Sequence, residues 1–147
     1  MKAAEITDEV IQAIEQGNRK FIRLNYANGD MVGHTGIVSS VLIAVAAVDL
    51  VMSRLLPALE KAKGVLMLTA DHGNADQMFT VKKGKRTPMV AHTLNPVPFL
   101  IKDYSGASRW QMAKVANPSL SHVAATICTL LGYQPPEDYD PPLVTLG

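Results

Sequence analysis

Two of the four histidines lie with aspartates directly after predicted strands. Asp30 and His34 share the loop that follows the first predicted strand, and Asp71 and His72 follow the second. A third histidine, His92, lies in a later loop. Because ligands in open α/β sheets collect beyond the carboxyl ends of the strands, we expect these loops to converge at one edge of the sheet.

Carboxylate oxygens and imidazole nitrogens together suit Mn²⁺, Zn²⁺ or Fe²⁺. Five such side chains are more than one tetrahedral site needs, so the pattern predicts a two-metal centre. Two divalent ions close together activate an oxygen nucleophile and neutralise charge on a transferring phosphoryl group. The residue types alone also allow a simpler interpretation, because aspartate often caps helices and histidine often makes ordinary surface hydrogen bonds.

Three longer motifs surround these side chains. They are Asn25–Gly36 (NYANGDMVGHTG), Thr69–Asp76 (TADHGNAD) and Ala91–Phe99 (AHTLNPVPF). Together with the ending from Val123 to Tyr139, they resemble the 2,3-bisphosphoglycerate-independent phosphoglycerate mutases of the alkaline phosphatase superfamily. The resemblance covers nearly the whole chain, but only the C-terminal portion of the family's much longer sequence.

The resemblance implies an alkaline-phosphatase-like fold and a glycolytic reaction. The family interconverts 3-phosphoglycerate and 2-phosphoglycerate through a phosphoserine intermediate at two Mn²⁺ ions. By position, Asp30, His34 and His92 would complete the protein ligands of one metal ion. Asp71 and His72 would give two ligands to the other. The expected partner is the small-molecule phosphoglycerate, with neither nucleic acid nor a membrane.

The resemblance also implies parts that these 147 residues lack. In the family, the second metal ion takes a further aspartate and the nucleophilic serine from near the start of the chain, and an inserted domain supplies arginines that hold the substrate. No catalytic residue is assigned, because no serine of this chain lies in a metal-like motif: Ser39, Ser40, Ser53, Ser105, Ser108, Ser119 and Ser121. We expect a single partial phosphatase-like domain over residues 1–147, an incomplete second metal site and an inactive isolated chain.

Two other functions stay open from the sequence. A related dimetal phosphohydrolase or phosphopentomutase would share the fold and much of the ligand chemistry, although Asn25–Gly36 and His92–Phe99 favour the mutase. A catalytically inactive, truncated metal-binding protein is the alternative from a different class. The missing nucleophile supports that alternative.

Length and composition agree with a soluble domain. Of the 147 residues, 48% are apolar and 18% are charged, so a core forms without a disulfide. Fourteen basic and 13 acidic residues create no overall field that would favour nucleic acid or an anionic membrane. Cys128 is the one cysteine, and Met1–Glu5 lacks the apolar run of a signal peptide. We therefore expect a cytoplasmic protein.

The predicted fold class is α/β, with a partly parallel sheet flanked by helices. The predicted elements are a helix over Thr7–Gln16, a strand over Phe21–Tyr26, a long helix from near Gly36 toward Lys63, a strand over Val65–Leu68, a strand over Val97–Ile101 and a helix over Ser121–Leu131. The order strand, helix, strand predicts that Phe21–Tyr26 and Val65–Leu68 lie parallel.

The long helix is unusually apolar. Ile37 to Val48 carries no charge, but Asp49 and Arg54 interrupt the run before the roughly 20 residues that a membrane span needs. We therefore expect a buried helix, kinked or interrupted at Pro57 and ended near Gly64.

Three further features are expected at the surface or in local contacts. Asp76–Met89 is polar and basic, which predicts an exposed excursion with Lys82–Arg86 as the solvated tip of a hairpin. Pro135–Pro142 should be a tail on the surface. His122 is expected to be a local hydrogen-bond partner without a role in the site.

Overall fold

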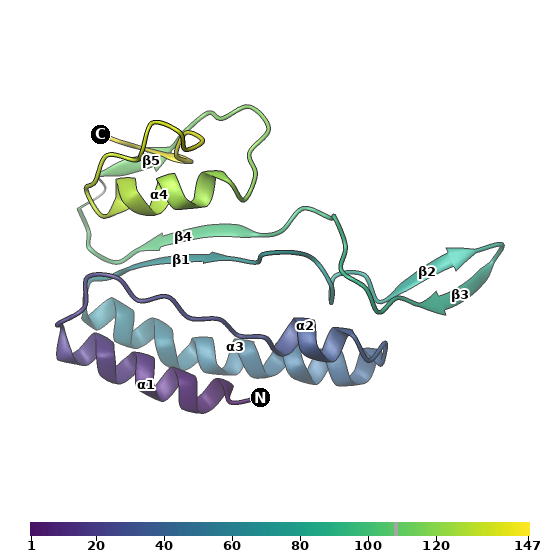
Figure 1. Cartoon of the computed structure of the whole chain (residues 1–147). Helices are drawn as coiled ribbons and strands as arrows, with labels where there is room; N and C mark the ends of the chain where they lie inside the picture. Colours follow the sequence, from purple (N-terminus) through teal and green to yellow (C-terminus); the bar gives the residue numbers. More distant parts are fainter. Residues whose placement is uncertain (108) are drawn as a thin grey trace. The chain divides into compact units, whose positions relative to one another are not determined.

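The structure, a computed structural model, describes residues 1–107 and 109–147, and Ser108 lies outside the described residues. The chain forms two compact units, Met1–Tyr104 and Ser105–Gly147 (Figure 1). In chain order the elements are α1 (Ala3–Gln16), α2 (Asn28–Gly33), α3 (Val38–Lys61), β1 (Val65–Thr69), β2 (Phe79–Lys82), β3 (Lys85–Pro88), β4 (Phe99–Asp103), β5 (Trp110–Met112), α4 (His122–Leu130) and β6 (Val144–Leu146).

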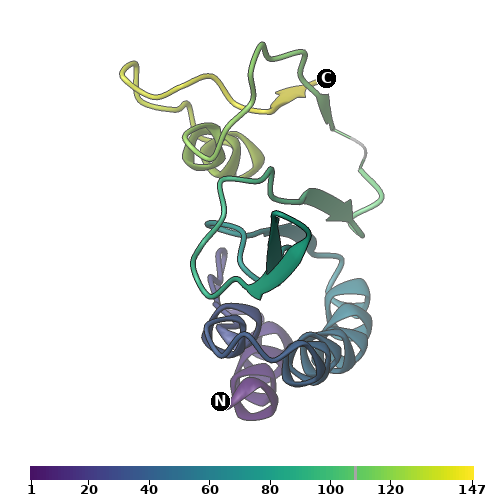
Figure 2. The ribbon, with the colours of Figure 1, turned by 90° about the vertical axis from the view of Figure 1, so that its right-hand side faces the viewer.

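Helices α1 and α2 of the first unit both pack against α3, and the β1–β4 ladder lies above this helical layer (Figures 1 and 2). The buried side chains of α1 are Ala3, Thr7 and Val10, and those of α3 are Val41, Ala44, Val51 and Leu55, so this core is mostly apolar. The Asn28 side-chain amide donates to the carbonyl oxygen of Ala44 at 3.4 Å. This contact fixes the start of α2, which carries Asp30, against α3.

Local signals set the helix ends. Helix α1 stops at Gly17, which has a φ of +66°, as its sequence predicts, although α1 begins four residues earlier than expected. Helix α3 continues through Pro57 to Lys61. The left-handed residue after α3 is Lys63, with a φ of +51°, and the N–H of Gly64 then donates to the carbonyl oxygen of Leu59 at 2.9 Å. Gly64 therefore helps to end the helix without itself turning left-handed.

The parallel strand pairing predicted from the sequence is not confirmed among the described residues. Strand β1 pairs antiparallel with β4, from Val65 opposite Asp103 to Thr69 opposite Phe99, and every strand pair among the described residues is antiparallel. The segment Phe21–Tyr26 pairs with no strand in the part of the chain that the structure describes. Side chains that favour strands do not form one unless a neighbouring backbone offers hydrogen bonds.

The two remaining strand predictions differ in outcome. The strand expected over Val97–Ile101 begins only at Phe99, since Pro98 has no N–H to donate to a ladder. The predicted basic hairpin is confirmed, because β2 and β3 pair on either side of Lys83 and Gly84. Both residues have positive φ, +50° and +75°, which is the backbone of a tight two-residue turn.

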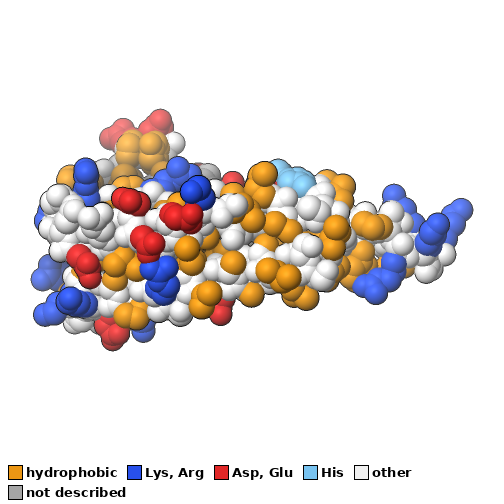
Figure 3. Space-filling view, turned by 90° about the horizontal axis from the view of Figure 1, so that it is seen from below, with side chains coloured by type: hydrophobic (Ala, Val, Ile, Leu, Met, Phe, Trp, Pro, Cys, Tyr) orange, Lys and Arg blue, Asp and Glu red, His pale blue; other side chains and the backbone are white. Residues whose placement is uncertain are grey.

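The expectation of a buried α3 is wrong for most of its surface. Neighbouring helices cover one side only, where Val41, Ala44, Val51 and Leu55 are buried. Leu42 and Ile43 are 66% and 73% exposed. Hydrophobic side chains therefore spread over the helical face of this unit (Figure 3). By length and composition, α3 is also long and apolar enough to cross a membrane, a property that it shares with core helices of soluble proteins.

The second unit is built around α4, which contacts β6, while β5 pairs with β6 from Trp110 opposite Leu146. Its core includes the fully buried Ala125, Thr126 and Val144. His122 Nδ1 lies 2.8 Å from the carbonyl oxygen of Pro141, so the predicted local role of this histidine is confirmed. The tail before Pro142 is largely exposed, as expected.

Candidate metal centre

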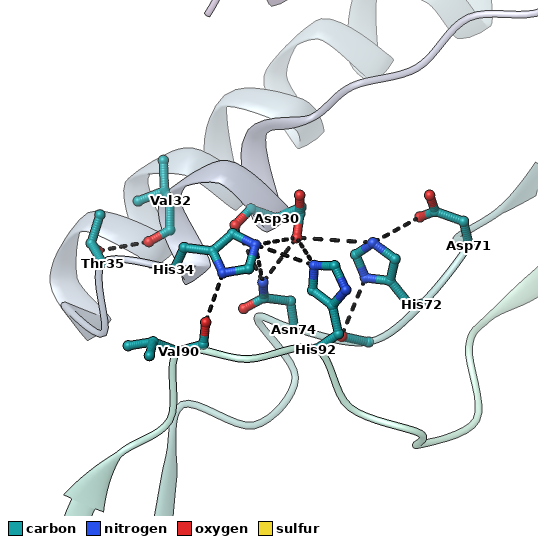
Figure 4. A network of polar contacts seen from close by, with 10 residues as sticks. Asp30, Val32, His34, Thr35, Asp71, His72, Asn74, Val90 and His92 are labelled. Carbon is teal, nitrogen blue, oxygen red and sulfur yellow. Dashed lines mark hydrogen bonds and ion pairs between the residues drawn. The ribbon is translucent and has the colours of Figure 1, made fainter.

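Asp30, His34 and His92 come together from two separate segments of the first unit (Figure 4). The short helix α2 and its C-terminal cap place Asp30 and His34 four residues apart on one face. His92 arrives from the loop between β3 and β4. His34 Nε2 lies 3.1 Å and His92 Nε2 3.0 Å from Asp30 Oδ1, and the two nitrogens are 3.2 Å apart.

This triangle has the dimensions of a metal site. Atoms about 2.1 Å from one ion, at tetrahedral or octahedral angles, lie about 3.0–3.4 Å from one another. All three ligand atoms of Asp30, His34 and His92 meet that spacing. Two imidazoles with one carboxylate suit a first-row divalent ion such as Mn²⁺, Co²⁺ or Zn²⁺.

The hydrogen bond of His34 to Val90 leaves its other ring nitrogen available as a metal ligand. His34 Nδ1 lies 2.7 Å from the carbonyl oxygen of Val90, and only an N–H can donate to a carbonyl, so Nδ1 carries a proton. In a neutral His34, Nε2 then presents a lone pair to the Asp30 carboxylate. Lone pairs of His34 Nε2 and of the Asp30 carboxylate thus face each other, as the donor atoms of two ligands of one metal ion do. A carbonyl on the far nitrogen is also the usual way in which proteins orient a metal-binding histidine.

The pKa of Asp30 lies below its ordinary value. Burial acts to raise the pKa, but a hydrogen bond from Asn74 and the charges of the nearby histidines lower it by more. The carboxyl group is therefore ionised at neutral pH and available as a ligand. Sequence reasoning did not single out Asn74 as a site residue, although it lies within the Thr69–Asp76 motif.

The remaining two predicted ligands lie differently. The ring of His72 stacks on that of His92, and its Nε2 is 4.0 Å from Asp30 Oδ1. Asp71 is 84% exposed, and its Oδ1 lies 3.7 Å from His72 Nε2 (Figure 4). Within the described part of the chain, the side chains close enough to share one ion are Asp30, His34 and His92.

A second polar cluster, also missed from the sequence, holds the two histidine loops together. The N–H of Thr93 donates to the carbonyl oxygen of Gly73 at 2.8 Å, and its hydroxyl donates to Asp76 Oδ2 at 3.1 Å. The amide of Asn95 donates to the same oxygen at 2.6 Å. The hydrogen bond from Asn95 is the main reason that the pKa of Asp76 lies below its ordinary value.

Comparison with known proteins places this geometry in context. The family described as the Metalloenzyme superfamily matches residues 1–135. Among curated relatives, a probable 2,3-bisphosphoglycerate-independent phosphoglycerate mutase of Leptospira interrogans is 44% identical over 98% of this chain and 28% of its own length. The 2,3-bisphosphoglycerate-independent phosphoglycerate mutase of Trypanosoma brucei brucei is 42% identical over 100% of this chain and 28% of its own length.

A third relative and a solved structure agree with these matches. The corresponding mutase of Pseudomonas aeruginosa is 43% identical over 100% of this chain and 27% of its own length. A crystal structure of Leishmania mexicana phosphoglycerate mutase at low cobalt concentration matches with a TM-score of 0.92 and 38% identity, over 100% of this chain and 29% of that one. The chain thus has the fold of the matching part of that mutase, and it spans less than a third of these relatives.

Proposed function

This chain belongs to the Metalloenzyme superfamily, and we propose that it is the metal-binding part of a 2,3-bisphosphoglycerate-independent phosphoglycerate mutase. The convergence of Asp30, His34 and His92 carries the proposal, because it provides a divalent-ion site within a chain 39–46% identical to curated mutases. We take the fold to be the C-terminal part of an alkaline-phosphatase-like domain.

The proposed reaction is the interconversion of 3-phosphoglycerate and 2-phosphoglycerate in glycolysis, in the cytoplasm, through a phosphoserine. The relatives are more than three times as long as this chain, and we propose that the serine and the substrate-binding arginines belong to such a longer protein. Resemblance to the family is the basis for the pathway, the intermediate and the cellular location.

Within this reaction, Asp30, His34 and His92 would hold one ion, and Asp71 and His72 would contribute to a second, with Mn²⁺ as the proposed metal. A bound divalent ion lowers the pKa of an oxygen nucleophile and offsets charge on a phosphoryl group.

The lowered pKa of Asp30 keeps that carboxylate ionised. The Val90 carbonyl holds the His34 ring so that Nε2 faces the other ligands. The exposed Asp71 carboxylate is free to turn toward groups supplied by the longer protein.

A chimera tests the proposal directly. This chain would replace the corresponding segment of the Pseudomonas aeruginosa mutase, with which it aligns over its full length. Formation of 2-phosphoglycerate from 3-phosphoglycerate would be followed with an enolase-coupled assay in Mn²⁺. We expect turnover in the chimera, a loss of at least about 10³-fold on His34→Ala, and no change on Glu9→Gln at the exposed surface of α1.

Two results would contradict the proposal. One is a folded, Mn²⁺-loaded chimera without turnover, with folding checked by circular dichroism against the parent mutase. The other is release of inorganic phosphate without 2-phosphoglycerate, which would favour a dimetal phosphohydrolase.

A further inference from the structure

Asn74 lies behind the candidate metal ligands and contacts two of them. Its side-chain amide nitrogen donates to Asp30 Oδ1 at 2.9 Å and to the main-chain oxygen of Asp30 at 3.3 Å. The same nitrogen lies 3.4 Å from His34 Nε2 (Figure 4). Asn74 is 5% exposed and comes from the loop after β1, so it ties helix α2 to the loop that carries His72.

The Asn74 amide must turn its nitrogen toward Asp30, because both atoms that it meets there are oxygens that accept hydrogen bonds. The opposite orientation would place the amide oxygen against the carboxylate and the carbonyl of Asp30, which are both acceptors. In the observed orientation, Asn74 Oδ1 is buried and meets no hydrogen-bond partner among residues 1–107 and 109–147. An unpaired buried oxygen costs free energy. The free-energy cost of the buried Asn74 Oδ1 thus accompanies the hydrogen bond that the amide nitrogen donates to Asp30.

Gly33 provides the space that this arrangement needs. A Cβ atom at position 33 would lie 2.1 Å from Asn74 Oδ1 and 2.6 Å from its Cγ, which is far inside van der Waals contact. The Asn74 side chain is short and buried, so it has little room to move away from such a Cβ atom. Because Gly33 lies in α2 directly before His34, a larger residue there would push the amide away from Asp30.

We propose that Asn74 is a positioning residue that holds the Asp30 carboxylate in its metal-binding orientation, and that Gly33 is needed to seat it. The inference rests on the metal site of the proposed function. The hydrogen bond uses one lone pair of Oδ1 and limits rotation of the carboxylate, while the other lone pairs stay available to an ion. A carboxylate held in place before binding loses less conformational freedom when a metal ion arrives.

The test is a Co²⁺ titration of the purified chain, followed by visible absorption, which reports both affinity and ligand geometry. Loss of a group that orients a ligand typically weakens metal binding about 10–100-fold. We expect Asn74→Ala to weaken Co²⁺ binding by that factor and to alter the absorption bands.

A double variant separates positioning from packing. Gly33→Ala alone should lower both the thermal unfolding midpoint and Co²⁺ affinity, because the new methyl group meets Asn74. In Gly33→Ala/Asn74→Ala the clash is gone, so the midpoint should rise again relative to Gly33→Ala. Co²⁺ affinity should stay as weak as in Asn74→Ala, since the donor is still missing.

Three results would overturn the inference. The first is wild-type Co²⁺ affinity and absorption in Asn74→Ala, and the second is recovery of affinity together with stability in the double variant. The third is absence of Co²⁺ binding by the unaltered chain, which would remove the proposed metal site as well. A chimera without mutase turnover would contradict the proposed reaction alone, and Asn74-dependent Co²⁺ binding would then still support the positioning role.

Discussion

The imidazole rings of His72 and His92 are stacked, with centroids 3.6 Å apart and planes inclined by 16°. The two histidines come from different loops, which the hydrogen bond from Thr93 to Gly73 holds side by side. His92 is thus supported on one face by His72 and faces Asp30 and His34 with its Nε2. The stack places His72 beside the metal site of Asp30, His34 and His92. The sequence predicts His72 as a ligand of the second metal ion.

Removal of His72 should therefore affect the first site moderately. We expect His72→Ala to weaken Co²⁺ binding by the chain about 3–10-fold, because His92 loses its stacking partner but all three close ligands remain. Asp71→Ala should change the affinity by less than about twofold, since that side chain is largely exposed. An Asp71→Ala loss larger than the His72→Ala loss in parallel titrations would contradict this arrangement.

The Asp76 cluster should make stability depend on pH. The pKa of Asp76 in the folded chain is lowered, chiefly by the Asn95 hydrogen bond, so its stabilising contribution is full above the unfolded pKa of about 3.9. That contribution is lost as the pH falls through the lower folded value. Asp76→Asn should therefore lower the unfolding midpoint at pH 7, and the gap to the unaltered chain should close below about pH 4.

Thermal unfolding followed by circular dichroism between pH 3 and pH 7 checks the prediction. Asn95→Ala serves as the matched control, because it removes the donor and leaves the carboxyl group in place. It should reduce the same pH dependence. A gap between Asp76→Asn and the unaltered chain that stays constant over the whole pH range would show that the carboxylate is not responsible.

Buried and exposed leucines of α3 should differ strongly in their effect on stability. Leu55 is 2% exposed and Leu50 is 66% exposed, on the same helix. We expect Leu55→Ala to cost about 2–5 kcal/mol of unfolding free energy, and Leu50→Ala to stay within about 0.5 kcal/mol. Urea unfolding of the two variants measures both values. Similar losses in both would mean that the outer face of α3 is covered.

The exposed apolar face of α3 should bind hydrophobic probes. Replacing Leu42 and Ile43 together by glutamine removes two of its most exposed large side chains. We expect lower fluorescence of a bound naphthalene-sulfonate dye and less self-association in sedimentation, with an unfolding midpoint within a few degrees of the unaltered chain. Dye binding that persists at its full level would place the apolar surface elsewhere.

Features that depend on neighbouring residues in sequence could be predicted well. Gly17 has a φ of +66° and directly follows the helix predicted to end at Gln16, and the predicted hairpin turns at Lys83 and Gly84, which both have positive φ. The grouping of Asp30, His34 and His92 could be anticipated, because these residues lie within two of the motifs that resemble the mutase family, Asn25–Gly36 and Ala91–Phe99.

Features that depend on distant partners could not be predicted. Phe21–Tyr26 has the side chains of a strand, but its state depends on whether another backbone pairs with it. Periodicity in α3 cannot tell which faces are covered, because the helix is apolar almost all round. Asn74 is uncharged and is not a usual metal ligand, so its residue type alone does not point to a metal site. Its hydrogen bonds to Asp30, which only the structure provides, identify it as part of the site.

The most direct test of the account is a calorimetric titration of the purified chain with Mn²⁺, repeated with His34→Ala and His92→Ala. We predict one site per chain that is weakened at least about 100-fold in each variant, because either change removes one of three converging ligands. Wild-type binding in both variants, or no binding by the unaltered chain, would contradict the claim that Asp30, His34 and His92 form a metal site.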